Sequence, residues 1–289
     1  VHLAKAQPKV IEMKSERTDN GYDIYAMNRG YCSYLISFKF KNVRNLSGAP
    51  SVNMEFELPV GRHKLLSLRT IHSDQSSNYN YSYSYRKGRK MKKLQETFTY
   101  LLPIKHGTRT QVDHMSYIGD NYGTQKESDK PVDFYGLTFS TNSGDTIYAV
   151  RSGMVVEVVD QKAGRNTNLS FSNEVNTVEI FHKDGTFALY KLFQKDGIFV
   201  KPGQKVIAGM PIGIIGGDQF LRGSHLRFYL YYAHKDQRTA FVKPTFASKE
   251  RTGLIDDKMT VTSLHTEAVI TQEMNKQQRK KWKKKLSQL

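Results

Sequence analysis

Short segments of alternating apolar and polar residues fill the first part of the chain, from about residue 20 to 116. The clearest are YCSYLISFKF (31–40), SVNMEFELPV (51–60), KLLSLRTI (64–71) and ETFTYLLPI (96–104). A period of two is typical of half-buried β-strands, and the Gly, Asn and Pro residues between the segments mark turns. The pattern predicts an immunoglobulin-like β-sandwich domain over residues 1–116.

The remaining chain divides into three parts. Residues 117–131, YIGDNYGTQKESDKP, are rich in turn-forming residues and predict a connector. Residues 132–247 have glycine turns roughly ten residues apart and no helical period, so they predict a second all-β domain. In the extension 248–289, the segment from residue 266 onward lacks Gly and Pro, which predicts a C-terminal basic helix or tail.

The charge of the chain indicates which kinds of partner it attracts, and its cysteine count determines whether a disulfide can form. The chain has 289 residues, a formal net charge of +17 and a single cysteine, Cys32, so no disulfide can form within it. Basic residues cluster in KQQRKKWKKK (276–285) and RKGRKMKK (86–93). Such clusters attract an anionic polymer or a membrane surface, and nothing in them is specific for nucleic acid. The triplet Ala-Lys-Ala before Gln7 resembles the end of an export signal and predicts an exported protein.

One strand-like stretch, NYNYSYSYRKGRK (78–90), carries tyrosine at every second position. The first interpretation is an edge hairpin that packs its tyrosines on a neighbouring strand while the serines face water. The second is a surface for stacking on sugar rings, bases or a partner, helped by adjacent cations. The residues of this candidate binding surface are Tyr79, Tyr81, Tyr83, Tyr85, Arg86, Lys87 and Arg89.

Four motifs follow one another in the second β block. They are GDTIYAVRSGMVVEVV (144–159), NTVEIFHKDGTFALYKLF (176–193), VKPGQKVIAGMPIGIIGG (200–217) and GSHLRFYL (223–230). In this order they resemble the lysostaphin-type, or LytM-like, zinc endopeptidases that cut peptidoglycan cross-bridges. The resemblance covers about residues 132–247 and implies that family's barrel-sandwich β fold, a duplicated hybrid motif.

The resemblance also implies where zinc ligands would lie. The family uses a His-x-x-x-Asp pair and the second His of a His-x-His pair, with a further catalytic His in a Tyr-x-His motif. Three such ligands leave a position at which zinc lowers the pKa of a bound water. Here the His-x-x-x-Asp pair falls on Phe134 and Thr138, and Leu192 takes the place of the histidine after Tyr190.

The His-x-His pair falls on His225 and Arg227, so the position that would bind zinc carries a guanidinium. Arginine has no lone pair to donate and keeps its charge, which excludes it as a zinc ligand. No metal and no cofactor are therefore expected. A buried Arg227 is predicted to have a partner, and the groove is predicted to bind through the following residues: Phe134, Thr138, Tyr190, Leu192, His225, Arg227 and Tyr229.

These expectations give a function and two alternatives. The chain is expected to be a pseudoenzyme of the bacterial cell envelope or periplasm that binds peptidoglycan or an envelope protein, as a regulator of wall hydrolases. One alternative is an active peptidoglycan endopeptidase with unusual zinc ligands. The other is an adhesive scaffold that binds polyanions through its basic clusters.

Overall fold

The computed structural model describes residues 9–50, 54–91, 98–115, 134–163, 169, 172, 174–234 and 239–286. The chain forms two compact units, Val1–Met91 and Lys92–Leu289. Strands are the main regular structure of the described residues in both units, and the described helices lie near the C-terminus, as the hydrophobic pattern predicts. No helix among these residues combines the length and apolar character needed to cross a membrane.

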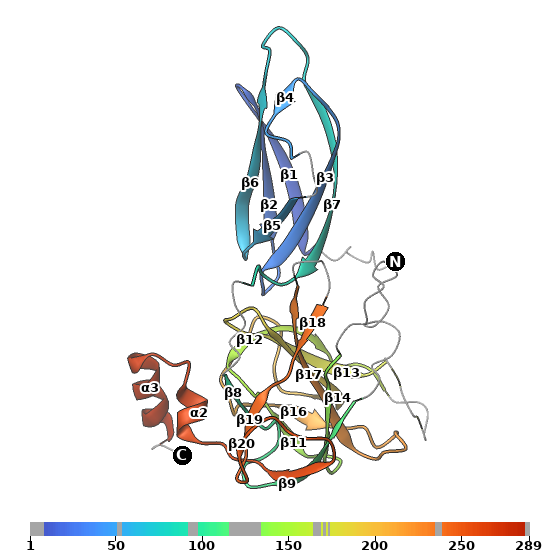
Figure 1. Ribbon diagram of the computed structural model, residues 1–289, viewed down its shortest axis with the longest axis vertical. Helices are drawn as coiled ribbons and strands as arrows, with labels where there is room; N and C mark the ends of the chain where they lie inside the picture. The colour runs from blue at the N-terminus through green and yellow to red at the C-terminus, as the bar shows by residue number, and fades with distance from the viewer. Residues whose placement is uncertain are drawn as a thin grey trace, which may run out of the picture. The chain divides into compact units, whose positions relative to one another are not determined.

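The first unit is built from two antiparallel sheets (Figure 1). The first contains, in spatial order, β1 (Ile11–Thr18), β2 (Gly21–Asn28), β6 (Gly61–Thr70) and β4 (Leu46–Ser47), and the second contains β5 (Met54–Leu58), β3 (Tyr34–Arg44) and β7 (Asn78–Lys87). Ile24 and Leu68 of the first sheet and Ile36 of the second are fully buried. The alternation in these strands therefore separates a buried side from a solvated one.

The first unit ends at Met91 rather than at the predicted residue 116. Its expected last strand is β8 (Thr99–Leu101), which pairs in parallel with β19 (Thr245–Ala247) of the second unit. The next strand, β9 (Arg109–His114), pairs with β10 (Leu137–Ser140). The alternating segment 96–104 contains β8. The partners of both strands are set by the tertiary fold, because they lie far away in the sequence.

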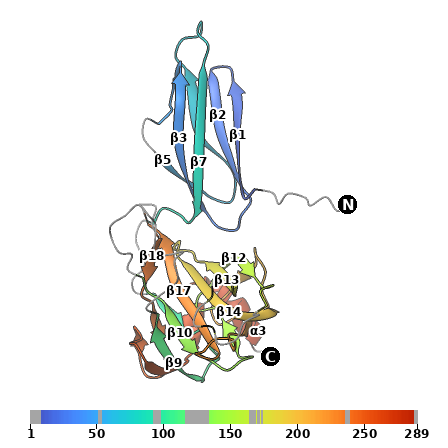
Figure 2. The same ribbon diagram turned by 90° about the vertical axis from the view of Figure 1, so that its right-hand side faces the viewer.

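The second unit is dominated by an eleven-stranded sheet among the described residues. Its main path is β15 (Lys205–Val206), β12 (Gly153–Val159), β13 (Asn176–Phe181), β14 (Phe187–Ile198), β17 (His225–Ala233), β10, β9 and β21 (Met259–Thr262). Off this path, β16 (Pro211–Ile215) pairs with β11 (Thr146–Tyr148) and β14, and β18 (Thr239–Val242) pairs with β17. Figure 2 shows β9, β10, β17 and β14 following one another across the sheet. Residues 248–263 belong to this unit, because β20 (Thr252–Gly253) pairs with β19 and β21 pairs with β9.

Two short helices follow, α2 (Glu267–Thr271) and α3 (Lys276–Leu286). The hydroxyl of Thr266 caps α2 by accepting from the backbone N–H of Val269. At α3 the side chains of Asn275 and Gln278 each accept from the other's backbone N–H at 2.9 Å, which is a capping box. The predicted basic helix is therefore confirmed, and its first turn is fixed by specific bonds.

Candidate functional site

Strand pairing places two of the candidate positions, and a lysine that was not among them, on one face of the large sheet. Arg227 on β17 lies opposite Thr138 on β10 and, on its other side, opposite Lys191 on β14. Residues directly opposite in antiparallel strands point to the same face. All three side chains are buried, with 5% of Arg227, 4% of Thr138 and 7% of Lys191 exposed. We call this group, together with His225, the Arg227 face.

Arg227 has the partner that its burial requires. Its Nε donates a hydrogen bond to Nε2 of His225 at 3.2 Å, and its guanidinium lies 4.6 Å from the ring centre of Phe220. Burial lowers the pKa of Arg227 to about 10, and the positive charge of Arg222 adds to the effect. The guanidinium remains protonated at neutral pH, so the Arg227 face carries a permanent positive charge.

His225 is held in its neutral form. Its Nδ1 lies 2.7 Å from the carbonyl oxygen of Gly223, which can only accept, so Nδ1 carries the hydrogen and Nε2 accepts from Arg227. Burial lowers the pKa of His225 to about 4; the Gly223 carbonyl opposes this shift, and Arg227 and Arg222 add to it. Both ring nitrogens are therefore engaged in hydrogen bonds.

Lys191 is the second cation of the face. Burial and, to a smaller extent, the charge of Arg227 together lower the pKa of its ammonium to about 8. The sequence predicts that Lys191 points away from Leu192, and strand pairing directs it to the side of Arg227. The site prediction omitted this lysine. The signal that could have found it is its position next to Tyr190, because neighbouring residues in a strand point to opposite faces.

Arg222 and Asp113 form an ion pair at the edge of the same face. Asp113 also accepts from Nε2 of Gln111 at 3.1 Å, and its backbone oxygen lies 3.4 Å from the hydroxyl of Thr138, which donates to it. The carboxylate of Asp113 is thus already neutralised by Arg222, and the hydroxyl of Thr138 is directed to the main chain.

Tyr190 and Leu192 lie in the hydrophobic core and not with Arg227. Tyr190 is fully buried, and its hydroxyl accepts from the backbone N–H of Val150 at 2.9 Å. Leu192 has a φ of 84° and lies where the pairing of β13 and β14 shifts register, so it is the extra residue of a β-bulge. Its buried hydrocarbon side chain supplies no donor atom.

Phe134 fills part of the same face with aromatic contacts. Its ring centre lies 4.9 Å from that of Phe241 and 6.0 Å from that of Tyr229, with the rings nearly perpendicular in both pairs. Leu189 packs in the same cluster. Phe134 and Tyr229 are therefore brought together by packing, which is the arrangement that aromatic side chains favour.

The residues at the positions implied for zinc do not fit this metal. Phe134 and Leu192 have no donor atom, Thr138 bonds to the main chain, and Arg227 brings a positive charge. The carboxylate neighbouring Phe134, Asp133, lies outside the described residues. Elsewhere in the described part of the chain, no three His, Cys, Asp or Glu side chains are grouped as a metal site. His182 is fully buried and hydrogen-bonded through Nδ1 to Thr186 at 2.9 Å, inside a tight turn.

The tyrosines of β7 pack within their own unit. Tyr81 and Tyr83 lie 5.6 and 6.4 Å, centre to centre, from the ring of buried Phe38, and Tyr79 lies 5.1 Å from Tyr22 of the other sheet. The intervening asparagine and serines are exposed. Of the adjacent cations, Arg86 pairs with Glu55 at 3.0 Å and Arg89 with Glu57 at 3.7 Å. These contacts favour the packing interpretation, although Tyr85 is 45% exposed.

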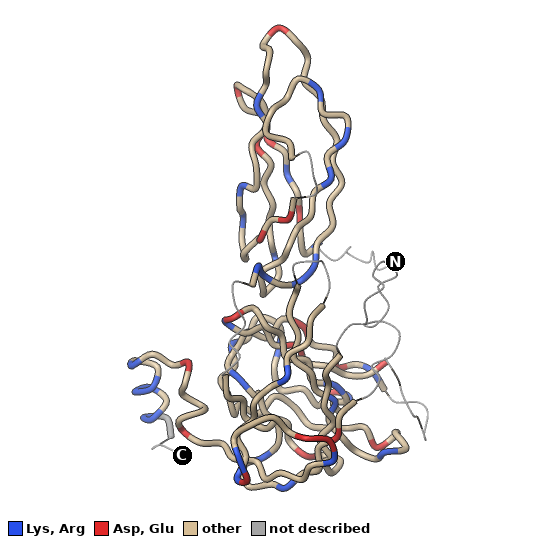
Figure 3. Tube along the Cα trace, viewed as in Figure 1, with Lys and Arg blue, Asp and Glu red and all other residues tan. Residues whose placement is uncertain are grey.

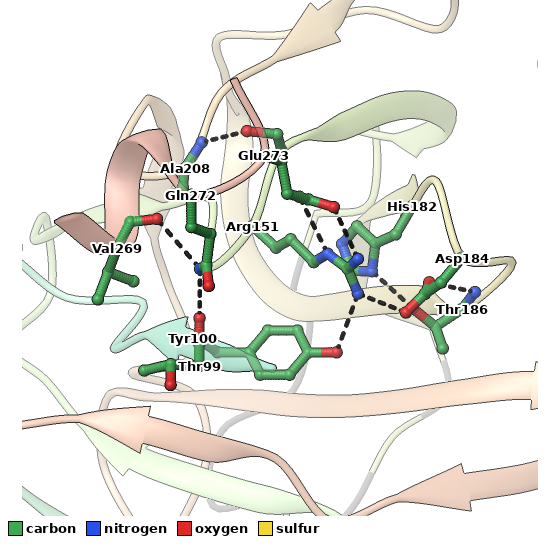
Figure 4. Close-up of polar contacts among 11 residues, drawn as sticks. Thr99, Tyr100, Arg151, His182, Asp184, Thr186, Ala208, Val269, Gln272 and Glu273 are labelled. Atoms are coloured by element: carbon green, nitrogen blue, oxygen red, sulfur yellow. Dashed lines mark hydrogen bonds and ion pairs between the residues drawn. The ribbon is translucent and has the colours of Figure 1, made fainter. Parts of the chain in front are cut away.

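Sequence reasoning missed a second polar centre, at Arg151. Its guanidinium is 1% exposed and binds Glu273 through two hydrogen bonds, of 2.7 and 3.1 Å, and Asp184 through one of 2.5 Å (Figure 4). It also donates to the hydroxyl of Tyr100 and stacks 3.7 Å from the ring centre of Phe98. Burial acts to lower the pKa of Arg151, but the bonds to Glu273 and nearby negative charges raise it overall. The only signal in the sequence was a lone charge in the apolar run before Gly153.

Comparison with known proteins gives loose structural likenesses and one family match. The catalytic domain of the prophage-encoded M23 protein EnpA from Enterococcus faecalis is 20% identical, covers 48% of this chain and 93% of its own, and has a TM-score of 0.31. Csd3 from Helicobacter pylori is 13% identical over 97% of this chain and 77% of its own, with a TM-score of 0.32. A zinc-containing peptidase from Vibrio cholerae is 12% identical over 80% and 83%, with a TM-score of 0.33.

The curated proteins contain no match to this chain. The family comparison does give a match, to peptidase family M23, over residues 133–239. This range includes β10 to β17 and so contains Lys191, His225 and Arg227. Residues 133–239 therefore match peptidase family M23, in agreement with the resemblance seen in the motifs.

Proposed function

We propose that this protein is a non-catalytic, peptidase-like protein of the bacterial cell envelope that binds peptidoglycan or an envelope protein. In this proposal the M23-like block provides a binding surface rather than a hydrolytic centre, and no zinc is held at the Arg227 face. The protein would then act as a regulator of wall hydrolases, outside the cytoplasm. The family match supports the wall-related role, and the chemistry of the face supports binding without cleavage.

The bond between Arg227 and His225 is the observation that carries the proposal. A zinc ligand must offer a lone pair, and the only imidazole of the predicted His-x-His pair already uses its free lone pair to accept from Nε of Arg227. A divalent ion placed there would also meet the charges of Arg227 and Lys191. Hydrolysis without a metal would need another nucleophile and base, which these residues do not supply.

Metal analysis and a digestion assay test the proposal together. The purified full chain is incubated with zinc, desalted and analysed for metal, and the same sample is incubated with purified sacculi. We expect far less than one equivalent of zinc and no release of soluble peptide. One equivalent that is lost in His225→Ala but kept in His63→Ala, accompanied by release of peptide, would instead establish the active endopeptidase.

Binding is tested by co-sedimentation of the full chain with sacculi. Arg227→Met keeps the length of the side chain but removes the charge, so we expect about a tenfold loss of affinity, typical of a lost charge-assisted bond. Arg251→Met, at an exposed arginine outside the face, is the matched control and should bind as the wild type does. Equal binding of both variants would place the contact elsewhere on the protein.

A second candidate, a polyanion-binding scaffold, is favoured by the way α3 is anchored. Lys and Arg residues follow one another along this helix (Figure 3), and no acidic residue lies within it. Its capping box fixes its first turn, and the bonds between Glu273 and Arg151 attach the segment just before it to the rest of the second unit. A fixed helix presents its charges together and loses less conformational entropy on binding than a loose tail would.

A further inference from the structure

Among the described strands of the first unit, β7 is the sheet edge with the least protection against pairing. Four strands lie at sheet edges: β1, β4, β5 and β7. Proteins protect such edges by keeping the strand short or by placing charges, proline or a bulge on it. β4 has two residues and β5 has five, and β1 alternates charged side chains at Glu12, Lys14 and Glu16. β7 has ten residues, and its first eight, NYNYSYSY, contain neither a charge nor a proline.

The backbone of β7 directs alternate hydrogen-bonding groups away from β3. The N–H of Gly88 donates to the carbonyl oxygen of Ser33 at 2.9 Å, and the pairing of β7 with β3 continues without a register shift as far as Asn80. In an antiparallel ladder, directly bonded pairs alternate with pairs that share no bond. Every second residue from Gly88 toward Asn80 therefore bonds to β3, and the residues between them direct N–H and C=O outward. These outward-facing residues include Tyr81, Tyr83 and Tyr85.

The two faces of β7 differ in chemistry. The tyrosine rings point to the interior of the sandwich, where Tyr81 and Tyr83 pack on Phe38. The small asparagine and serine side chains are exposed on the outer face, opposite Lys39 and Lys41 of β3. Both lysines are exposed, and neither is paired with an acidic residue in the described part of the chain. The outer face beside the edge is therefore cationic, and the short side chains of β7 do not block the lysines from extending across it.

We infer that the edge of β7 binds an extended peptide with acidic side chains at every second position. The peptide would add a strand to the sheet, with backbone bonds to the outward-facing tyrosines. Neighbouring strands lie about 4.8 Å apart, so an acidic residue of the added strand lies roughly 10 Å from Lys39 or Lys41, a gap that a lysine and a glutamate side chain span together. A second copy of the chain suits this edge less well, because each copy bears a formal charge of +17.

Calorimetric titration of the full chain with two peptides tests the inference. The first is acetyl-VETEVET-amide, and the second, acetyl-VKTKVKT-amide, reverses every charge. We expect the acidic peptide to bind at least about tenfold more tightly than the basic one. Equal affinity for the two peptides, or no binding of the acidic one, would overturn the inference.

Two double variants test whether the lysines of the outer face make the contact. Lys39→Gln combined with Lys41→Gln should remove at least about tenfold of the affinity for the acidic peptide. Lys14→Gln combined with Arg17→Gln makes the same charge change on β1 and is the matched control, which should bind nearly as the wild type does. An equal loss in both double variants would show attraction by net charge alone and would contradict a site at β7.

Two substitutions at Tyr83 test whether the strand edge makes the backbone contact. Both Tyr83→Ala and Tyr83→Pro remove the ring, but only proline also removes the outward N–H. This N–H makes no bond to β3, so the two variants should have similar melting temperatures, since an edge strand tolerates proline at such a position. Tyr83→Pro should bind the acidic peptide at least about tenfold more weakly than Tyr83→Ala. Equal binding by the two folded variants would refute pairing at this edge.

N-methylation of the acidic peptide gives the same information without changing the protein. One peptide is methylated at its glutamates and another at its remaining residues. Since one set of N–H groups would face β7 and the other solvent, one pattern should abolish binding and the other should preserve it. The same outcome for both patterns would exclude an added strand.

Sedimentation velocity of the chain without peptide tests the alternative occupant, and a monomer is expected. A dimer that Tyr83→Ala retains and Tyr83→Pro loses would assign the edge to a second copy and overturn the inference. The site lies in the first unit, so the inference goes beyond the proposed function and does not depend on the Arg227 face. Arg227→Met should therefore leave the affinity for the acidic peptide unchanged, whatever its effect on binding to sacculi.

Discussion

Arg227 and His225, two residues apart on β17, share a hydrogen bond on one face of the strand, 3.2 Å from Nε to Nε2. The period of a β-strand brings them together. The same spacing would let two imidazoles hold one metal ion, but here the second residue donates to the first. The exchange of one side chain turns a pair of potential ligands into a donor–acceptor pair.

Arg227→Met should raise the pKa of His225 above its wild-type value of about 4. The substitution removes a nearby positive charge that disfavours the imidazolium, while burial, the larger cause, remains and keeps the pKa below the ordinary histidine value. A pH titration of the imidazole by NMR measures the change. Arg69→Met, in the first unit, should leave it unaltered. A pKa that stays the same or falls would contradict the coupling of the two side chains.

Lys191 should make stability depend on pH in the alkaline range. Its pKa in the folded protein is about 8 and the ordinary pKa of a lysine is 10.5, so below about pH 8 the fold bears the full cost of the buried ammonium. As pH rises from 8 to 10.5 the unfolded chain binds more protons than the folded one, and stability rises. Relative to Lys191→Met, the free energy of unfolding of the wild type should increase by up to about 3 kcal/mol across this window.

Denaturant titrations of both proteins at several pH values check this expectation. Lys205→Met serves as the control, because an exposed lysine should show no such difference. A flat difference between wild type and Lys191→Met from pH 8 to 10.5 would show that the ammonium is not destabilised by burial.

Glu273→Gln should destabilise the second unit by about 3 kcal/mol, because it leaves the buried Arg151 short of a charged partner. Hydrogen exchange at the backbone of α2 and α3 should speed up as their attachment loosens. Glu267→Gln breaks an exposed ion pair with Lys283 and is the matched control, with stability close to that of the wild type. Equal stability of the two variants would show that the contacts of Arg151 contribute little.

Neutralising α3 should weaken binding to phosphate polymers in a salt-dependent way. Lys280→Gln combined with Lys281→Gln removes two exposed charges, so the slope of log affinity against log salt should fall by about one to two units. Lys201→Gln combined with Lys205→Gln makes the same charge change elsewhere in the unit. If both pairs lower the slope equally, binding reflects net charge and not the helix.

Alternation of apolar and polar residues was enough to predict the β character of both units and the face of β17. It places His225, Arg227 and Tyr229 on one face of this strand, in agreement with the pairing of β17 with β10 and β14. Helix-forming residues without Gly or Pro likewise predicted α3. In these cases the information is local, because the period and composition of a segment act within that segment.

The other features depend on contacts that local patterns do not contain. The positive φ of Leu192 creates a bulge and directs a branched apolar residue into the core, although glycine or asparagine would be the usual sign of this conformation. The positions of β9 and β21 in the large sheet depend on the pairing of these two strands, which are far apart in the sequence, with each other. Arg151 and Glu273 are 122 residues apart in the chain, and no pattern within either segment indicates the other.

The contacts of Arg151 with Glu273, Asp184 and Phe98 determine where the C-terminal segment can be truncated without disturbing the fold. A truncation that starts at Lys276 takes away the cationic helix and leaves Glu273 in place. A truncation before Glu273 leaves the buried guanidinium of Arg151, which packs against aromatic rings, with Asp184 as its remaining carboxylate partner among the described residues. Shortened forms that end before this glutamate would lose their fold and their polycationic surface together, so only the longer truncation distinguishes what the C-terminal segment does from what it supports.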